Sequence, residues 1–425
     1  MNLTRNQIII IGIGTLIVIV VILIFTGVIP GLQQGGGGQQ AVQLTIFGVE
    51  NERNFRDLID SYVKLKPGIK IAYTQFSKDD FEKKLLEALA AGRGPDIISF
   101  HNSWLPKHFD KIIPAPATQI SLNQVQQLFP KVVEQNFVSG DKVYALPLYI
   151  DTLAMLYNKD TFDAKGIALQ PVNWTEFQSL VPKLREVNNF GQLTKPAAAI
   201  GGSGKSIDTA APLLNLLLMQ FGGPSVESLG EVKFGEAGAE AFNFYLSFGN
   251  AASANYTWND NLRYSLDDFS QGGTAIIFDY NSAVPTIKSK NTFLNLGIAP
   301  MPQLAGASQP INQADYWGLA VTNQSRNPAW AWDFIITAAT NSQLSDAYLK
   351  SSNQPPALRS LINNSLDDPN LGVFARQALT ARAWPGPASA ALNRIFSNML
   401  ESVLTGRLTQ NQAIAQAENE INSIR

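Results

Sequence analysis

The stretch that decides the fold is residues 42–76, which read VQLTIFGVENERNFRDLIDSYVKLKPGIKIAYTQF. Its first six residues alternate apolar and polar side chains, which predicts a half-buried strand. Apolar residues then recur at helical spacing over 54–65, which predicts an amphipathic helix. Pro67 and Gly68 end that helix, and the alternation of 69–76 predicts a second strand.

The same alternation of elements continues beyond this stretch. Ser77 and Asp80 have the spacing of a capping box and predict a helix that reaches Ala91, with Gly92 beyond its end. The apolar run Ile97–Phe100 follows as a third strand. Strands that alternate with helices predict an α/β fold with a mostly parallel sheet, in which ligands bind beyond the carboxyl ends of the strands.

The second half of the chain repeats this pattern. Asn173 predicts the cap of a helix that begins at Trp174, and Pro328 predicts the start of another. Two amphipathic helices, 389–405 and 410–424, end the chain. Because a single core rarely grows beyond about 250–300 residues, the 425 residues predict two lobes, each with a mostly parallel sheet flanked by helices.

Composition excludes several classes of function. Lys and Arg number 32 against 34 Asp and Glu, and no basic stretch is interleaved with aromatic residues, so we expect no nucleic-acid partner. The chain has no cysteine, which removes disulfides, thiol nucleophiles, cysteine-based metal sites and a lipid-modified cysteine. We expect no metal, no cofactor and a monomeric chain.

The N-terminus predicts a membrane anchor. Ile8–Ile29 is almost wholly aliphatic and uncharged, and crossing a bilayer needs about 20 such residues. Arg5 precedes this segment and Glu50 is the first charge after it, so the positive-inside rule places residues 1–7 in the cytoplasm. We expect an uncleaved, single-pass anchor with the globular part extracytoplasmic, joined by a flexible linker over 30–41.

Short motifs in a fixed order resemble the family 1 extracellular solute-binding proteins, which include the maltose- and other sugar-binding components of ABC importers. Each motif alone is weakly specific, but together they cover nearly all of the chain after the linker. The motifs are PGIKI at 67–71, AAGRGPDI at 90–97, YALP at 144–147, LYNKD at 156–160, NWTE at 173–176, GGTAI at 272–276, GIAPMP at 297–302, YWGLAV at 316–321 and AWDF at 331–334.

The resemblance implies a periplasmic-binding-protein-like fold whose lobes close on a ligand. It implies that a small polar solute, with a mono- or oligosaccharide favoured, is captured and passed to the permease subunits of an ABC importer, without catalysis. It also implies crossings between the lobes near 148–151 and 296–300, with a return near 324–327. The corresponding lobes are 42–148 with 299–325, and 149–298 with 326–425.

Candidate binding residues combine aromatic rings with polar groups, as sugar faces and hydroxyls require. Some follow from position, because they end or follow predicted strands or form a polar-aromatic loop. The others follow from the resemblance, which places them at the first crossing, in an aromatic pair that lines the cleft, and in a Pro-rich wall loop. The candidates are Glu50, Trp104, Tyr149, Asp151, Trp258, Asn259, Asp260, Asp279, Tyr280, Tyr316, Trp317, Arg382 and Trp384.

Other functions remain as alternatives. A membrane-anchored hydrolase could use cleft carboxylates on a glycoside, and a binding protein could take a peptide, a polyamine or a glycerophosphodiester. The segment GGSGKS at 201–206 suggests a phosphate-binding loop, but the required first glycine is Ala199, so we interpret it as a polar loop. The chain lacks HExxH and GxSxG, so metalloprotease and serine hydrolase sites are not expected.

Overall fold

The computed structural model describes residues 42–190, 192–223, 225–226, 231–382, 384 and 389–424. A six-stranded sheet, here sheet A, has the order β2-β1-β3-β17-β4, and β7 also pairs with β17. β1 and β3 are parallel, as predicted, but β17 is antiparallel to β3, β4 and β7. The strands are β1 (Val42–Gly48), β2 (Ile69–Gln75), β3 (Ile97–His101), β4 (Ile112–Ile113), β7 (Leu146–Pro147) and β17 (Trp317–Thr322).

The helices beside sheet A form where the sequence predicts them. Ser77 accepts the backbone N–H of Asp80 and caps α3, and Asn51 caps α2, which buries its apolar face. The hydroxyl of Tyr62 on α2 donates to Asp333 of α13 over 2.6 Å. These helices are α2 (Glu52–Leu65), α3 (Lys78–Ala90), α4 (Leu105–His108), α5 (Leu122–Leu128), α6 (Lys131–Phe137), α13 (Pro328–Thr340) and α14 (Ser342–Ser352), with the 3-10 turn η1 (Phe109–Lys111) after α4.

A three-stranded sheet, here sheet B, has the order β14-β9-β15. Both named pairings are antiparallel, so the predicted mostly parallel second sheet is wrong. Its strands are β9 (Ala154–Asn158), β14 (Ile276–Asp279) and β15 (Leu296–Ala299). Its helices are α7 (Lys159–Ala164), α8 (Trp174–Leu184), α9 (Ala210–Phe221), α10 (Gly235–Ser247), α11 (Ser265–Ser270), α12 (Val284–Lys290), α17 (Ser389–Leu404) and α18 (Gln410–Ser423), with η2 (Asn281–Ala283) before α12.

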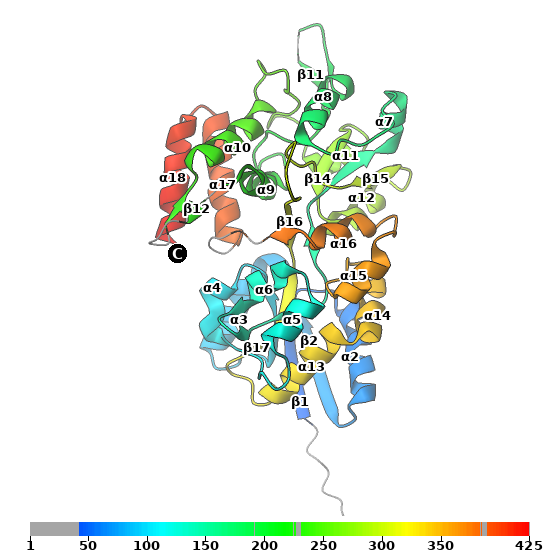
Figure 1. Ribbon diagram of the computed structural model, residues 1–425, viewed down its shortest axis with the longest axis vertical. Coiled ribbons are helices and arrows are strands. Elements are labelled where there is room, and N and C mark those ends of the chain that lie inside the picture. The colour runs from blue at the N-terminus through cyan, green and yellow to red at the C-terminus, as the bar shows by residue number, and fades with distance from the viewer. Residues whose placement is uncertain are drawn as a thin grey trace, which may run out of the picture. The chain divides into compact units, whose positions relative to one another are not determined.

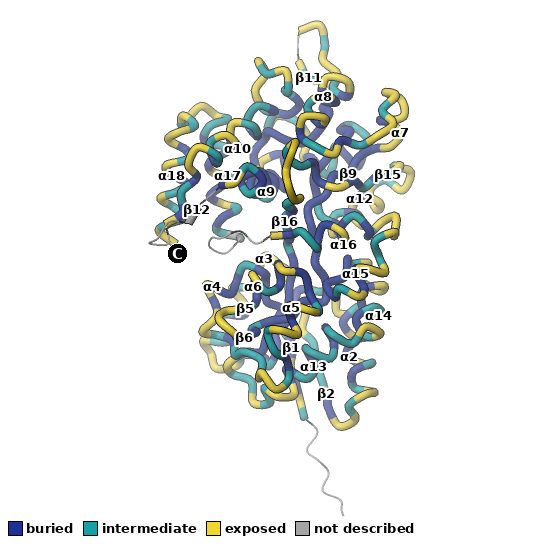
Figure 2. The backbone as a smooth tube through the Cα atoms, viewed as in Figure 1, coloured by how far each residue is buried: buried dark blue, intermediate teal, exposed yellow. Residues whose placement is uncertain are grey.

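The core of the sheet B region is aromatic where α8 meets the sheet. The ring of Trp174 lies 5.4 Å from Phe177, and Phe177 lies 5.5 Å from Phe278 of β14. Figure 2 shows buried chain in the interior of both sheet regions and exposed chain mainly on the loops and outer helix faces. Among the described residues, three short ribbons lie outside these sheets, namely β5–β6 (Val138–Ser139 and Lys142–Val143), β10–β11 (Glu186–Val187 and Leu193–Lys195) and β12–β13 (Ser225–Val226 and Val232–Lys233).

A third sheet, here sheet C, lies between the other two (Figure 1). It consists of β8 (Asp151–Thr152), β16 (Asn312–Asp315) and β18 (Ala381–Arg382), and the chain passes between the two larger regions at each strand. The side chain of Gln377, from α16 (Gly372–Ala378), holds β8 by donating to the Thr152 hydroxyl and the Leu153 carbonyl. The remaining helix is α15 (Arg359–Ser365).

The predicted lobe limits differ from this arrangement. The expected second crossing at 296–300 coincides with β15 inside sheet B, and the chain crosses later, at β16. The expected return at 324–327 is a turn beside sheet A. Helices α13 and α14 then pack against α2, so residues 328–352 stay with sheet A instead of joining the other lobe.

The predicted cytoplasmic tail, anchor and linker, residues 1–7, 8–29 and 30–41, lie outside the described residues. Among the helices that the structure describes, none has both the length and the apolar character needed to cross a membrane.

Candidate functional site

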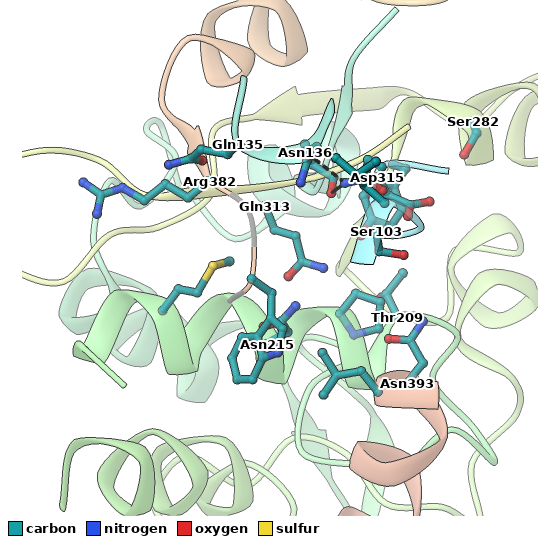
Figure 3. Close-up of a pocket in the computed structure, with 18 of the residues that line it drawn as sticks. Ser103, Gln135, Asn136, Thr209, Asn215, Ser282, Gln313, Asp315, Arg382 and Asn393 are labelled. Atoms are coloured by element: carbon teal, nitrogen blue, oxygen red, sulfur yellow. Dashed lines mark hydrogen bonds between the residues drawn. The ribbon is translucent and has the colours of Figure 1, made fainter. Parts of the chain in front are cut away.

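A cavity of about 740 Å³ opens among the three sheets, a size within the ~300–1,000 Å³ typical of small-ligand sites. Figure 3 shows Gln313 of β16 reaching into it, between Ser103 and Asn136 on one side and Thr209 and Asn215 on the other. The lining includes Phe109, Tyr144, Tyr280 and Trp384 as aromatic residues, and Asn102, Ser103, Gln135, Asn136, Ser139, Asp208, Thr209, Asn215, Asp279, Ser282, Thr286, Gln313, Asp315, Arg382 and Asn393 as polar residues.

One side of the cavity, here wall A, consists of Asn102 and Ser103 after β3 with Gln135 and Asn136 of α6. Asn102 donates its amide to the carbonyl of Ala314 and to Asn136. Asn136 also accepts the hydroxyl of Tyr316 over 2.8 Å. These bonds fix the amide side chains in place, because each buried donor has found an acceptor. Wall A is therefore neutral, polar and preorganised.

The opposite side, here wall B, consists of Asp208, Thr209 and Asn215, at and within the start of α9, and Asp279 at the end of β14. Asp208 precedes Thr209, the N-cap of α9, and Asn215 lies within the helix, and all three residues line the cavity. The Thr209 hydroxyl donates to the Phe278 carbonyl, which ties α9 to β14. Wall B therefore brings two carboxylates and an amide to the same region.

Asp315 of β16 lies at the junction of the walls and pairs with a histidine. Nε2 of His101 lies 2.8 Å from Oδ1 of Asp315, and Nδ1 of His101 lies 2.8 Å from the Ser103 hydroxyl. Although burial acts to raise the pKa of Asp315, the attraction and hydrogen bond of His101 together lower it. Asp315 is therefore an ionised acceptor whose position is fixed by wall A.

Asp151 of β8 lies directly opposite Asp315 in sheet C and supports the other wall. Its carboxylate accepts the backbone N–H groups of Asn281 and Ser282 over 2.9 and 3.0 Å. Burial raises the pKa of Asp151 to about 7, although these N–H groups act to lower it. Asp151 thereby holds the segment with Tyr280 and Ser282, which lines the cavity.

Asp279 accepts fewer backbone hydrogen bonds than Asp151. It is 6% exposed and accepts the backbone N–H of Tyr280 over 2.8 Å. Burial, together with the negative charges of Asp208 and Asp151, raises its pKa to about 8, although the Tyr280 N–H acts to lower it. A carboxyl group in this setting gains much from a hydrogen-bonding or charged ligand.

Several side chains around the cavity hold polar atoms without a partner among the described residues. These are the amide oxygens of Asn102, Asn215 and Gln313 and the indole N–H of Trp384. Because a buried polar group without a partner costs roughly 1–3 kcal/mol, such a cluster indicates a place where a ligand or water completes the bonding.

Four of the residues predicted from the sequence line the cavity: Asp279, Tyr280, Arg382 and Trp384. Trp384 is half-buried, and its ring lies 5.6 Å from Phe396 of α17. In Figure 3, Arg382 lies on the opposite side of Gln313 from Ser103 and Asp315.

The predicted aromatic residues of sheet A lie behind wall A instead of lining the cavity. Trp317 is 8% exposed and meets Trp104 edge to face at 5.1 Å, and Tyr316 is fully buried. His101 packs on Trp317 at 4.9 Å. Trp317 points into the core because β17 is buried along its whole length, and Tyr316 directly precedes that strand. Trp104 and Trp317 contact His101 and thereby support Asp315.

The other predicted residues are held by partners away from the cavity lining. Trp258 is fully buried and donates its indole N–H to Ser206, and Asp260 accepts hydrogen bonds from Ser203 and Ser206. Asn259 donates to the hydroxyl of Tyr256. Glu50 accepts the hydroxyl of Tyr149 over 2.7 Å. The GGSGKS segment thus forms a loop braced by Asp260.

Sequence reasoning missed most of the polar lining, although signals for some of it were present. Asn215 interrupts the apolar helix AAPLLNLLLMQF, which is a reason to expect a function for this amide. Gln313 and Asp315 are two residues apart on a strand and therefore share a face. No local pattern marks Asn136 or Asn393, which reach the cavity through the packing of their helices.

The described part of the chain contains no group of three or more His, Asp or Glu side chains placed to hold a metal ion. The lining chemistry is that of a binding site for a polar organic molecule, with hydrogen-bonding groups around it and aromatic rings at Tyr144, Tyr280 and Trp384.

A family model described as bacterial extracellular solute-binding protein matches residues 49–344. Among curated proteins, a maltotriose-binding protein of Pyrococcus abyssi is 22% identical over 341 residues, covering 78% of this chain and 70% of the relative. A galactooligosaccharide-binding protein of Bacillus subtilis is 24% identical over 376 residues, covering 82% and 85%.

Solved structures share the fold. The sugar-binding protein MalE from Xanthomonas citri has a TM-score of 0.76 at 18% identity, covering 90% of this chain and 97% of that one. A cyclo/maltodextrin-binding protein complexed with maltotetraose has a TM-score of 0.73 at 17% identity, covering 92% and 98%. At these identities the likeness establishes the periplasmic-binding-protein-like fold.

Proposed function

The chain belongs to the bacterial extracellular solute-binding proteins, and on this premise we propose that it captures a mono- or oligosaccharide for an ABC importer. The observation that carries the proposal is the cavity, whose lining combines neutral amides, carboxylates and hydroxyls with aromatic rings. Sugar hydroxyls both donate and accept hydrogen bonds, and sugar faces pack on aromatic rings. The names of the maltotriose- and galactooligosaccharide-binding relatives support the same ligand class.

Binding is coupled to closure of the two sheet regions about sheet C. A ligand between the walls contacts Asp279 from one region and Asn136 from the other, and it makes both contacts only when the walls approach. Differential affinity of this kind shifts the population toward the closed arrangement. The three short strands of sheet C supply the hinge, and the closed protein then docks on the permease subunits.

The N-terminal segment completes the proposal. Ile8–Ile29 anchors the chain in the cell membrane with residues 1–7 in the cytoplasm, and the binding region lies outside. The test is protease treatment of intact cells that carry the protein. Without protease, the intact protein should stay in the membrane fraction. With protease, the residues after 41 should be digested because they lie outside the cell. Release of intact protein from untreated cells would contradict the anchor.

A thermal-shift panel tests the ligand class. The purified full chain, in detergent, is mixed with mono- and oligosaccharides, peptides, polyamines and glycerophosphodiesters. A carbohydrate at about 100 times its Kd should stabilise the fold by roughly 2.7 kcal/mol. Stabilisation by another class and by no carbohydrate contradicts the proposal. Chromatography of each carbohydrate after incubation distinguishes a binding protein, which returns it unchanged, from a hydrolase.

A further inference from the structure

Charge is unevenly distributed around the cavity. Three carboxylates, Asp208, Asp279 and Asp315, belong to its described lining, and Arg382 is the only Lys or Arg among those lining residues. Figure 3 shows Arg382 on the other side of Gln313 from Asp315 and from Thr209, which follows Asp208. The cavity therefore has an acidic end, defined here by the three aspartates, that Arg382 does not neutralise.

Within this acidic end, Asp279 is the carboxyl group with the least compensation. Asp315 is paired with His101, and Asp208 accepts the hydroxyl of Tyr264 over 2.9 Å. Asp279 accepts a backbone N–H, and the charged groups that act on it, Asp208 and Asp151, have the same sign as its own. Once ionised, Asp279 would attract a positive group strongly, because burial weakens the screening by water.

The unpartnered amides add an independent indication. Asn215 is 6% exposed, lies on the α9 face that lines the cavity, and its amide oxygen has no partner in the described structure. The amide oxygens of Asn102 and Gln313 are also buried and have no partner in the described structure. All three are acceptors, and with the carboxyl groups of the acidic end they offer hydrogen bonds to donors of a ligand. A ligand that satisfies them must be rich in donors.

We propose that the sugar carries a protonated amine and that Asp279 and Asp208 bind its ammonium group, which makes the preferred ligand an amino sugar. An ammonium group has three donors and no acceptor, so it matches an acceptor-rich site. The hydroxyls and ring of the same ligand face wall A and Trp384. This inference rests on the proposed carbohydrate-binding function and specifies its ligand class.

Calorimetry with matched ligand pairs tests the proposal. The pairs are glucose, galactose and mannose with their 2-amino-2-deoxy counterparts, and oligomers of two to four glucose or glucosamine units, with spermidine as an amine without a sugar. An amino sugar should bind at least tenfold more tightly than its hydroxyl counterpart in one or more pairs. Asp279→Asn should abolish that preference, and Asp208→Asn should reduce it. Asp346→Asn, at an exposed ion pair with Lys350, should leave it unchanged.

Proton release provides a second readout. Since burial raises the pKa of Asp279 to about 8, the carboxyl is largely protonated at pH 7 and must lose its proton to bind a cation. Binding at pH 7 should release about one proton per ligand, and affinity should fall up to about tenfold per pH unit below pH 7. Asp279→Asn should remove the release.

The outcomes separate the two proposals. If the hydroxyl sugar binds at least as tightly as the amino sugar in every pair, the proposed preference for an amino sugar is overturned, and the proposed carbohydrate binding stands. If spermidine binds and no sugar does, both the amine-bearing sugar and the carbohydrate function are overturned. An amino-sugar preference that survives Asp279→Asn overturns the assignment to the acidic end.

Discussion

The two walls of the cavity are both polar, but they are organised differently. In wall A, Asn102 and Asn136 are tied to each other and to sheet A through Tyr316, and no carboxylate is present. In wall B, Asp279 is supported by one backbone N–H, and the oxygen of Asn215 has no partner among the described residues. Both walls thus hold an unpartnered amide oxygen, at Asn102 and at Asn215, but the amides of wall A are tied to their neighbours, whereas wall B adds a buried carboxyl group with little support.

This difference indicates how each wall contributes to binding. A preorganised wall pays little ordering cost when a ligand arrives, so it determines shape and orientation. A wall with unsatisfied acceptors gains hydrogen bonds only when a ligand is present, so it determines which chemical groups are accepted. Substitutions of Trp317 behind wall A, of Trp384 in the cavity lining and of Asp279 in wall B separate these contributions.

The largest effect is expected behind wall A. Trp317→Ala removes a ring that packs on Trp104 and His101, so the free energy of unfolding should fall by roughly 3–5 kcal/mol. Trp330→Ala is the matched control, because that ring is 40% exposed and its loss should cost within about 0.5 kcal/mol. Chemical denaturation measures both. Equal, small losses would show that Trp317 does not support the wall.

Trp384→Ala should weaken carbohydrate binding by about 10- to 100-fold, which corresponds to roughly 1–3 kcal/mol. The ring lines the cavity, and its indole N–H lacks a partner among the described residues. Calorimetry with the carbohydrate identified in the thermal-shift panel gives the value. An unchanged Kd in a folded variant would remove Trp384 from the site.

Wall B predicts a pH effect on the stability of the ligand-free protein. The pKa of Asp279 is about 8 in the folded chain and about 3.9 when unfolded, so between pH 4 and 8 the folded state holds a proton that the unfolded state has lost. Stability should therefore fall as pH rises through this window, by on the order of 1 kcal/mol per pH unit. Asp151, with a pKa of about 7, acts in the same direction.

Thermal unfolding of Asp279→Asn beside the wild type, from pH 4 to 8, measures the contribution of this residue. The variant should show a shallower decline because its amide does not titrate. Parallel curves would mean that Asp279 is already ionised in the empty cavity.

The sequence predicted local elements well because their causes are local. The alternation in VQLTIF, the cap at Ser77 and the start of a helix at Pro328 all appear in the structure. The antiparallel pairing of β17 and the crossing at β16 were not predicted, because register and crossings depend on contacts between distant segments.

Residue type was a weaker guide to the site. Trp258, Trp317 and Tyr316 are candidate binding residues by their type, but aromatic rings serve cores as well as sites, and these three are buried. Asp279 and Tyr280 line the cavity because they end a strand, as the sequence indicated. Gln135 and Asn136 of wall A reach the cavity through the packing of α6, which leaves no signature in the chain itself.

The most direct test of carbohydrate binding between the two walls is a crystal structure of the protein with a carbohydrate that stabilises it. The account predicts that the sugar lies in the cavity and contacts Asp279 of wall B and Asn136 or Ser103 of wall A, with Trp384 against one face. A sugar bound outside the cavity, or touching one wall alone, would contradict the account.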